Sequence, residues 1–179
     1  MADRNSPIGV FDSGVGGLTV SREIMRQMPT ERIVYFGDTA RVPYGNKSGN
    51  TVIRFTRQII RFLLTQDVKA IVIACNTATA YALEAVEGEL DIPIIGVIHA
   101  GRTATQATKN GKIGIIGTEG TIRSGVYTKV MKGMRSDIEV TGKSCPLLVP
   151  LVEEGLLHDS VTDEIASRYL SELKGKYID

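Results

Sequence analysis

One cysteine of this sequence stands where a thiol could do chemistry. Cys75 follows the apolar run 70–74, which predicts a buried strand, and precedes Asn76 and Thr77 at the start of a predicted helix. A helix N-terminus lowers the pKa of a thiol from its reference of about 8.5, and the thiolate is the reactive form. Asn76 and Thr77 add hydrogen-bonding groups for a polar ligand. The alternative is a small buried cysteine that merely ends a strand.

A glycine-rich turn, 12–17, offers a second candidate site. It follows the apolar run 8–11 and precedes a predicted helix, so its backbone N–H groups and the helix N-terminus favour a small anion such as a carboxylate. The spacing matches neither the G-x-G-x-x-G fingerprint nor a P-loop, which disfavours nucleotides. Asp12 could handle a proton or an ammonium group. The alternative is a tight turn in which Ser13 caps the helix.

Three further segments carry weaker signals, each a polar group at a loop or a helix end. They are Tyr44 and Gly45 in the loop after the second predicted strand, Thr118 and Thr121 at a later helix start, and Glu153 and Glu154 in an apolar stretch. Loops at the carboxyl end of a sheet often carry function. An ordinary turn, a capped helix start and a solvated helix face are the respective alternatives. The two histidines and two lone cysteines have no metal-ligand spacing, so we predict no metal site.

Strand and helix patterns alternate along the chain, and this predicts an α/β fold with parallel sheets flanked by helices. The expected strands are 8–11, 33–36, 70–74, 94–97, 113–116, 138–141 and a beginning at 177–178; the expected helices are 18–28, 52–64, 77–90, 99–108, 121–131, 147–157 and 161–173.

Residues 8–14 and 113–119 resemble each other, since each is a strand that enters a small turn and then a helix. The echo predicts two similar domains, 1–98 and 99–179. The alternative is that any two such turns look alike.

Composition and charge exclude several classes of protein. The 179 residues are 42% hydrophobic, enough for a packed core, and their formal net charge of +1 leaves no basic footprint for nucleic acid. The sequence contains no stretch of about 18 apolar residues, so it predicts no membrane span. The first residues are not followed by the apolar run of a signal peptide, so we expect a cytoplasmic protein whose cysteines stay reduced.

Five motifs, in order along the chain, resemble those of glutamate racemases. They are Phe11 to Val20, Gly37 to Gly45, Ile73 to Ala80, Gly117 to Ile122 and Cys145 to Gly155. The resemblance implies two similar α/β domains with the active site in the cleft between them. It also implies interconversion of L- and D-glutamate, which supplies D-glutamate for peptidoglycan, without any cofactor or metal, and a homodimer at full length.

The resemblance assigns roles residue by residue. Cys75 matches a catalytic acid/base, Asp12 a catalytic and substrate-binding residue, and Glu153 an acidic residue that assists the second base, although Glu154 is its neighbour. The remaining substrate-binding positions are Ser13, Tyr44, Gly45, Asn76, Thr77, Thr118 and Thr121.

One element of the family pattern does not occur in these residues. The second catalytic cysteine of glutamate racemases lies in a Cys-Thr-His motif, and register arithmetic from the internal echo places it just after Asp179. We therefore expect that the C-terminal part of the family fold is missing and that the 179-residue chain alone does not racemise glutamate. An aspartate or other cofactor-independent amino-acid racemase, and a non-catalytic carboxylate-binding fragment, are the alternatives.

Overall fold

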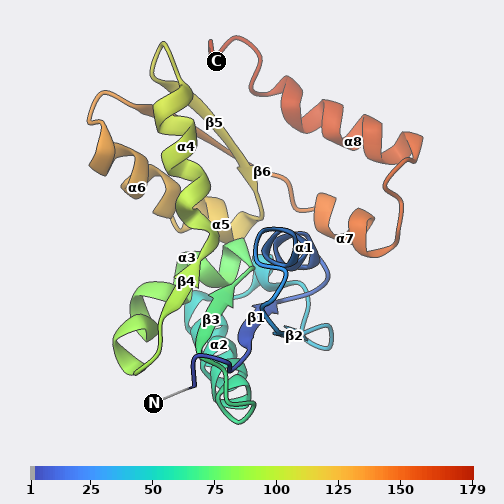
Figure 1. The fold of residues 1–179 in the computed structure, drawn as a ribbon. Helices are drawn as coiled ribbons and strands as arrows, with labels where there is room; N and C mark the ends of the chain where they lie inside the picture. Colours follow the sequence, from blue (N-terminus) through green and yellow to red (C-terminus); the bar gives the residue numbers. More distant parts are fainter. Residues whose placement is uncertain (1–2) are drawn as a thin grey trace. The chain divides into compact units, whose positions relative to one another are not determined.

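The computed structural model describes residues 3–179, apart from the side chain of His99. Strands alternate with helices along the chain (Figure 1), so the predicted α/β class is confirmed. The chain forms two compact units, one that runs to Val97 and one from Ile98 to Asp179.

The first unit is built on a four-stranded sheet whose paired neighbours are all parallel. In the order of the sheet, its strands are β2 (Ile33–Gly37), β1 (Ile8–Asp12), β3 (Ala70–Ile73) and β4 (Ile94–Gly96). Every residue of β1 is buried, as a strand covered on both faces requires. The carboxyl ends of β1 and its neighbour β3 therefore lie at one edge of the sheet, which is where Asp12 and Cys75 stand.

Helices cover both faces of this sheet. Side chains from α1 (Leu18–Gln27) pack in one apolar cluster with Val10 of β1. Side chains from α2 (Gly49–Leu64) and α3 (Asn76–Val86) pack in another cluster with Phe11, whose side chain points to the opposite face. Two single 3-10 turns, Tyr44–Asn46 and Glu87–Glu89, complete the unit.

The second unit is smaller in its sheet and in its core. Strands β5 (Lys112–Gly117) and β6 (Glu139–Ser144) pair in parallel. The buried core holds Ile113, Met131 and Ile138. Its helices are α4 (Ala100–Ala107), α5 (Glu119–Arg123), α6 (Val126–Met134), α7 (Leu148–Glu153) and α8 (Ser160–Ser171), with the 3-10 turn Val97–His99 before α4.

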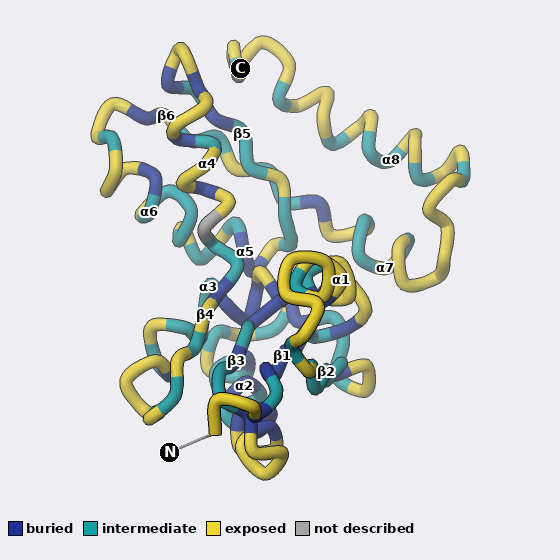
Figure 2. Tube along the Cα trace, in the orientation of Figure 1, coloured by how far each residue is buried: buried dark blue, intermediate teal, exposed yellow. Residues whose placement is uncertain are grey.

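The first unit, which has the larger sheet and core, is also the more deeply buried in its strands (Figure 2). Every residue of β1 and every second residue of β3 is buried in the first unit, whereas α8 has no buried residue. Within the described residues, no helix is long and apolar enough to cross a membrane.

Glycine conformations end two predicted helices earlier than the apolar pattern indicates. The expected helix 121–131 is two helices, because Gly125 adopts a left-handed φ of 66° between α5 and α6. The expected helix 147–157 stops at Glu153, because Gly155 has a φ of 76° and its N–H bonds back to the carbonyl of Val152. The expected helix 77–90 ends at Val86 and continues as a 3-10 turn.

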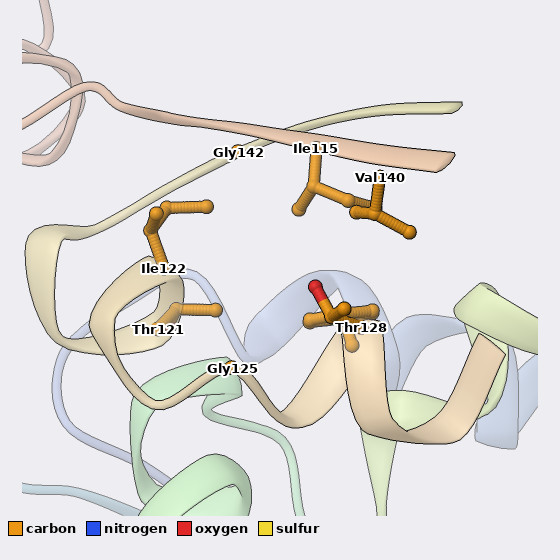
Figure 3. Close-up of a pocket in the computed structure, with 8 residues that line it drawn as sticks. Ile115, Thr121, Ile122, Gly125, Thr128, Val140 and Gly142 are labelled. Carbon is orange, nitrogen blue, oxygen red and sulfur yellow. The ribbon is translucent and has the colours of Figure 1, made fainter. Parts of the chain in front are cut away.

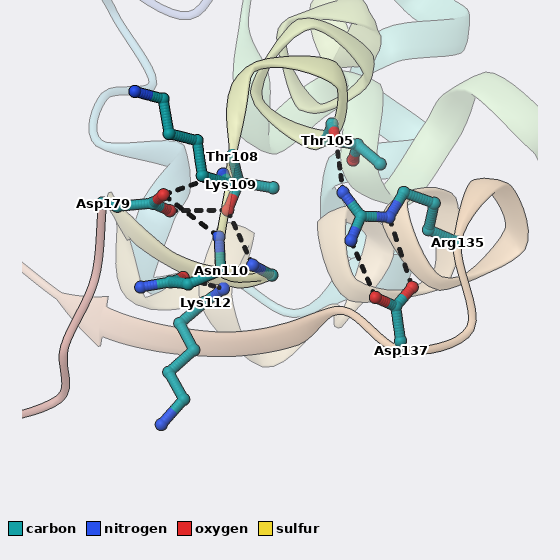
Figure 4. A network of polar contacts seen from close by, with 9 residues as sticks. Thr105, Thr108, Lys109, Asn110, Lys112, Arg135, Asp137 and Asp179 are labelled. Carbon is teal, nitrogen blue, oxygen red and sulfur yellow. Dashed lines mark hydrogen bonds and ion pairs between the residues drawn. The ribbon is translucent and has the colours of Figure 1, made fainter.

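The expected strand at 177–178 is wrong, because Tyr177 has a φ of 56°, which is left-handed and not extended. This segment nevertheless lies against β5. The backbone N–H of Asp179 donates to the carbonyl of Lys112 at 3.3 Å. The Asp179 carboxylate accepts hydrogen bonds from the Thr108 hydroxyl at 2.5 Å and the N–H groups of Lys109 and Asn110 at 2.8 and 3.2 Å (Figure 4).

Candidate active site

The carboxylate of Asp12 organises the glycine-rich turn from inside. Asp12 is 6% exposed, and its Oδ2 accepts hydrogen bonds from the N–H groups of Gly14 at 3.0 Å and Gly17 at 3.1 Å. Two of the N–H groups that we expected to face an anionic ligand are thus bonded within the turn. Ser13 is not the helix cap, since α1 begins after Gly17 without a side-chain cap.

Gly17 is required by the close packing of this turn. A Cβ at this position would lie 2.6 Å from the Cβ of Asp12 and 2.9 Å from that of Ala74. Both are Cβ atoms, whose positions are fixed by the backbone and do not change with the side-chain rotamer. The turn is therefore held at the ends of β1 and β3 at once.

Cys75 is the N-cap residue of α3, and its sulfur is held by two groups. The Sγ accepts a hydrogen bond from the N–H of Ala78 at 3.4 Å and is hydrogen-bonded to the Oγ of Ser13, also at 3.4 Å. The fold thereby brings Asp12, Ser13 and Cys75 together from two neighbouring strand ends.

The surroundings of Cys75 raise the pKa of its thiol, contrary to our expectation. Burial is the largest cause, because it disfavours the charged thiolate, and the nearby Asp12 carboxylate adds to it. Hydrogen bonds from Ser13 and Ala78 lower the pKa but do not outweigh these effects. Without a ligand, the raised pKa favours the protonated thiol of Cys75. A positive charge near Asp12 would offset the charge of that carboxylate and favour the thiolate.

Tyr44 and Gly45 are both buried, in the 3-10 turn after β2. The Tyr44 hydroxyl donates to the carboxylate of Asp38, which also forms an ion pair with Arg41 at 2.7 Å. Burial first, and then the bond to Asp38, raise the pKa of Tyr44. The ring belongs to the same apolar cluster as Cys75. The Tyr44 hydroxyl is thus bonded to Asp38. A ligand at this turn would therefore meet the backbone of Tyr44–Asn46 and not this hydroxyl.

Asn76 and Thr77 occupy the first turn of α3, directly after the thiol. Asn76 is exposed, whereas Thr77 is 2% exposed. The first turn of α3 therefore begins with an exposed polar residue that is followed by a buried one.

Two residues of this site were missed by sequence reasoning. Asp38 follows β2 directly, as Asp12 ends β1, and its N–H donates to the carbonyl of Asp12 at 2.9 Å. That repeated acidic residue at a strand end was the available signal. Tyr35 lies inside the apolar run of β2, and its hydroxyl donates to the carbonyl of Gly14 at 3.2 Å. Nothing in the apolar pattern marks Tyr35 as polar.

The second unit holds the remaining predicted residues. Thr118 caps α5, since its Oγ1 accepts from the N–H of Thr121 at 3.2 Å. Thr121 also lines a cavity of about 20 Å³ together with Ile122 and Thr128 (Figure 3), which is room for one water molecule. Glu153 is exposed at the last position of α7.

The structure thus groups Asp12, Ser13, Tyr44 and Cys75 in the first unit, and Thr118 with Thr121 in the second. Both cysteines are free thiols. Among the residues that the structure describes, no cluster of three or more His, Cys, Asp or Glu side chains could hold a metal ion.

A family profile described as Asp/Glu/Hydantoin racemase matches residues 8–174, nearly the whole chain. The chain belongs to the Asp/Glu/hydantoin racemase family. Within this family its resemblance to glutamate racemases is confirmed. The glutamate racemase of Geobacter metallireducens is 52% identical over 173 residues, which are 96% of this chain and 64% of that relative.

Solved structures of two family members have the same fold. A glutamate racemase from Bacillus anthracis is 45% identical and superposes with a TM-score of 0.94, over 99% of this chain and 67% of that one. A glutamate racemase from Francisella tularensis, solved in complex with D-glutamate, is 43% identical with a TM-score of 0.90, over 97% and 66% of the two chains. The chain spans less than two thirds of the length of the Geobacter relative.

Proposed function

We propose that this protein is a glutamate racemase, in which Cys75 carries a proton to and from the Cα of glutamate. The contact of Cys75 with Ser13, beside the buried Asp12 carboxylate, is the observation that supports this role most directly. The glutamate racemases similar to this chain support the choice of substrate.

The reaction requires one base and one acid on opposite faces of Cα. The Cys75 thiolate forms an S–H bond with the α-proton, and the electron pair of the broken C–H bond moves into the α-carboxylate. A second acid then gives a proton to Cα from the other face, which inverts the configuration. Hydrogen-bond donors around the α-carboxylate stabilise the negative charge that builds there.

Asp12 gives this chemistry a physical trigger. Its carboxylate raises the pKa of Cys75 in the structure, and the ammonium group of an amino acid bound near Asp12 would offset that charge. Substrate binding would therefore raise the fraction of Cys75 that is thiolate, the form that acts as the base. Asn76 and the backbone at Gly45 are suited to the substrate carboxylates.

The two compact units correspond, in this proposal, to the two domains of the family, with Thr118 and Thr121 contributing substrate contacts from the second. Glu153 would assist the second base. In glutamate racemases, by the resemblance described above, that base is the cysteine of a Cys-Thr-His motif. This motif does not occur in these 179 residues. We further propose that the whole protein acts without a cofactor, as a cytoplasmic homodimer that supplies D-glutamate for peptidoglycan.

Calorimetry and a chiral assay test this function on the 179-residue chain. We expect D-glutamate to bind and aspartate to bind more weakly, with no net formation of D-glutamate from L-glutamate because these residues hold one candidate base. Equal or tighter binding of aspartate would favour the aspartate racemase alternative. Binding of neither amino acid would overturn the proposal, and full racemisation would overturn the two-base mechanism.

A further inference from the structure

Tyr35 reaches the glycine-rich turn from the neighbouring strand. It pairs in register with Val10, two residues before the end of β1, and its ring packs against the apolar cluster that contains Val10 and Ala74. Its hydroxyl donates to the carbonyl of Gly14 at 3.2 Å and would lie 3.1 Å from a Cβ at Gly17. The ring is thus anchored in the core while the hydroxyl touches the turn.

The two peptide groups of Gly14 are held from two sides. The N–H of Gly14 donates to Asp12 at 3.0 Å, and its carbonyl accepts from Tyr35. Ser13 directly precedes Gly14 and shares the first of these two peptide groups with it, and its Oγ stands 3.4 Å from the sulfur of Cys75. The position of the Ser13 hydroxyl therefore depends on both bonds.

We propose that Tyr35 is a positioning residue for Cys75: by holding the Gly14 carbonyl, its hydroxyl keeps Ser13 in hydrogen-bonding contact with the thiol. This inference builds on the proposed function, which makes Cys75 the proton carrier. Removing the hydroxyl frees one side of Gly14 while leaving the ring in the core. Ser13 then loses its fixed place, and the thiolate loses a hydrogen bond that stabilises it.

The phenol acts as a neutral donor in this arrangement. Burial, followed by the charges of Asp12 and Cys75, raises the pKa of Tyr35 to about 12. It therefore keeps its proton throughout the neutral range, and it bonds to a backbone carbonyl. These properties suit a residue that fixes geometry and not one that exchanges protons with the substrate.

The test follows the alkylation rate of Cys75 against pH in the 179-residue chain, with each cysteine peptide quantified by mass spectrometry. In Tyr35→Phe we expect the Cys75 profile to move to higher pH and the rate at neutral pH to fall about threefold, the effect of one modest hydrogen bond. Ser13→Ala should produce the same shift, and Tyr35→Phe should add nothing in the Ser13→Ala background. Cys145, which is buried in the second unit, serves as an internal control whose profile stays unchanged.

A matched variant removes a tyrosine hydroxyl elsewhere. Tyr177 is 78% exposed, and Tyr177→Phe should leave the Cys75 profile as it is in the wild type. An unchanged profile in Tyr35→Phe, or a shift that adds to that of Ser13→Ala, would overturn the proposal. Should Tyr35→Phe fail to fold, an unshifted profile in Ser13→Ala overturns it equally. These readouts do not depend on racemisation, so they fail separately from the proposed function.

Discussion

Both units of this protein place a turn and a helix after a parallel strand, but different polar groups meet at the two turns. In the first, β1 pairs with β2 on one side and β3 on the other; in the second, β5 pairs with β6 on one side. On its other side, β5 receives a backbone hydrogen bond from the N–H of Asp179 to the carbonyl of Lys112, comparable to the bond from Lys69 to Pro7 where β3 begins to pair with β1.

Comparing the two units shows which features bring Asp12, Ser13 and Cys75 together. The Asp12–Ser13–Cys75 group needs the ends of two adjacent parallel strands, since Asp12 ends β1 and Cys75 follows β3. The turn after β5 also lies beside a parallel strand end, because Cys145 follows β6 and its N–H donates to the carbonyl of Gly117 at 2.8 Å. There, however, Thr118 bonds to Thr121, and the Sγ of Cys145 bonds to the carbonyl of Lys143 at 3.7 Å. Adjacent strand ends place a cysteine beside a turn in both units, but Cys75 also caps a helix and bonds through its sulfur to Ser13 of the turn.

The largest effect should come from closing the space at Gly17 in the first unit. Gly17→Ala places a Cβ within 2.6 Å of that of Asp12, so we expect a loss of about 3 kcal/mol in the free energy of unfolding. Chemical denaturation followed by circular dichroism measures it. Gly133→Ala is the matched control, because a Cβ there meets nothing within 4 Å, and a helical alanine should be slightly stabilising. Equal effects of the two substitutions would show that the turn is not tightly packed.

A smaller effect is expected from the capped turn of the second unit. Thr118→Ala removes the oxygen that accepts from the N–H of Thr121, and it should cost about 1 kcal/mol of unfolding free energy. Thr118→Ser keeps that oxygen and should cost much less. Thermal unfolding of the two variants decides this, and equal losses would deny Thr118 its capping role. Neither change should alter the alkylation profile of Cys75.

The smallest effect concerns Asp179 and depends on pH. Hydrogen bonds from Thr108, and then from the N–H of Lys109, hold the pKa of Asp179 below its usual value. Because the folded pKa is lowered, the stabilisation is present above the unfolded pKa and disappears as the pH falls through the folded pKa. Asp179→Asn should therefore be less stable than wild type at neutral pH, with a gap that closes in acid.

Thermal unfolding across the acidic range, with amide exchange at Lys109 and Asn110, tests this anchor. Asp91→Asn, at an exposed position before β4, is the control for the effect of the substitution itself. A pH-independent gap for Asp179→Asn would mean that the carboxylate is not what these groups bind.

The sequence indicated which residues meet at the edge of the sheet better than it indicated the direction of the Cys75 pKa shift. Parallel strands meet at one sheet edge, so the adjacency of Asp12 and Cys75 followed from the alternating pattern. The pKa of Cys75 depends on burial and on its distance to Asp12, which only the folded chain sets. Tyr35 lay hidden in an apolar run, because its ring is a core residue and only its hydroxyl acts on the turn.

The elements were predicted wherever an apolar pattern was strong. The break at Gly125 was missed, because one glycine in a helical pattern is often tolerated and its left-handed φ comes from the fold. Tyr177 was misjudged for a similar reason, since its short apolar neighbourhood resembles a strand while its backbone is left-handed.

The central claim, that Cys75 carries the α-proton of glutamate, is tested most directly by proton exchange. The 179-residue chain is incubated with D- and L-glutamate in deuterium oxide, and loss of the α-proton signal is followed by nuclear magnetic resonance. We predict solvent exchange of one enantiomer without inversion, lost in Cys75→Ala and retained in Cys145→Ala. Exchange that survives in Cys75→Ala, or wild-type chain that binds D-glutamate and exchanges neither enantiomer, would contradict the claim.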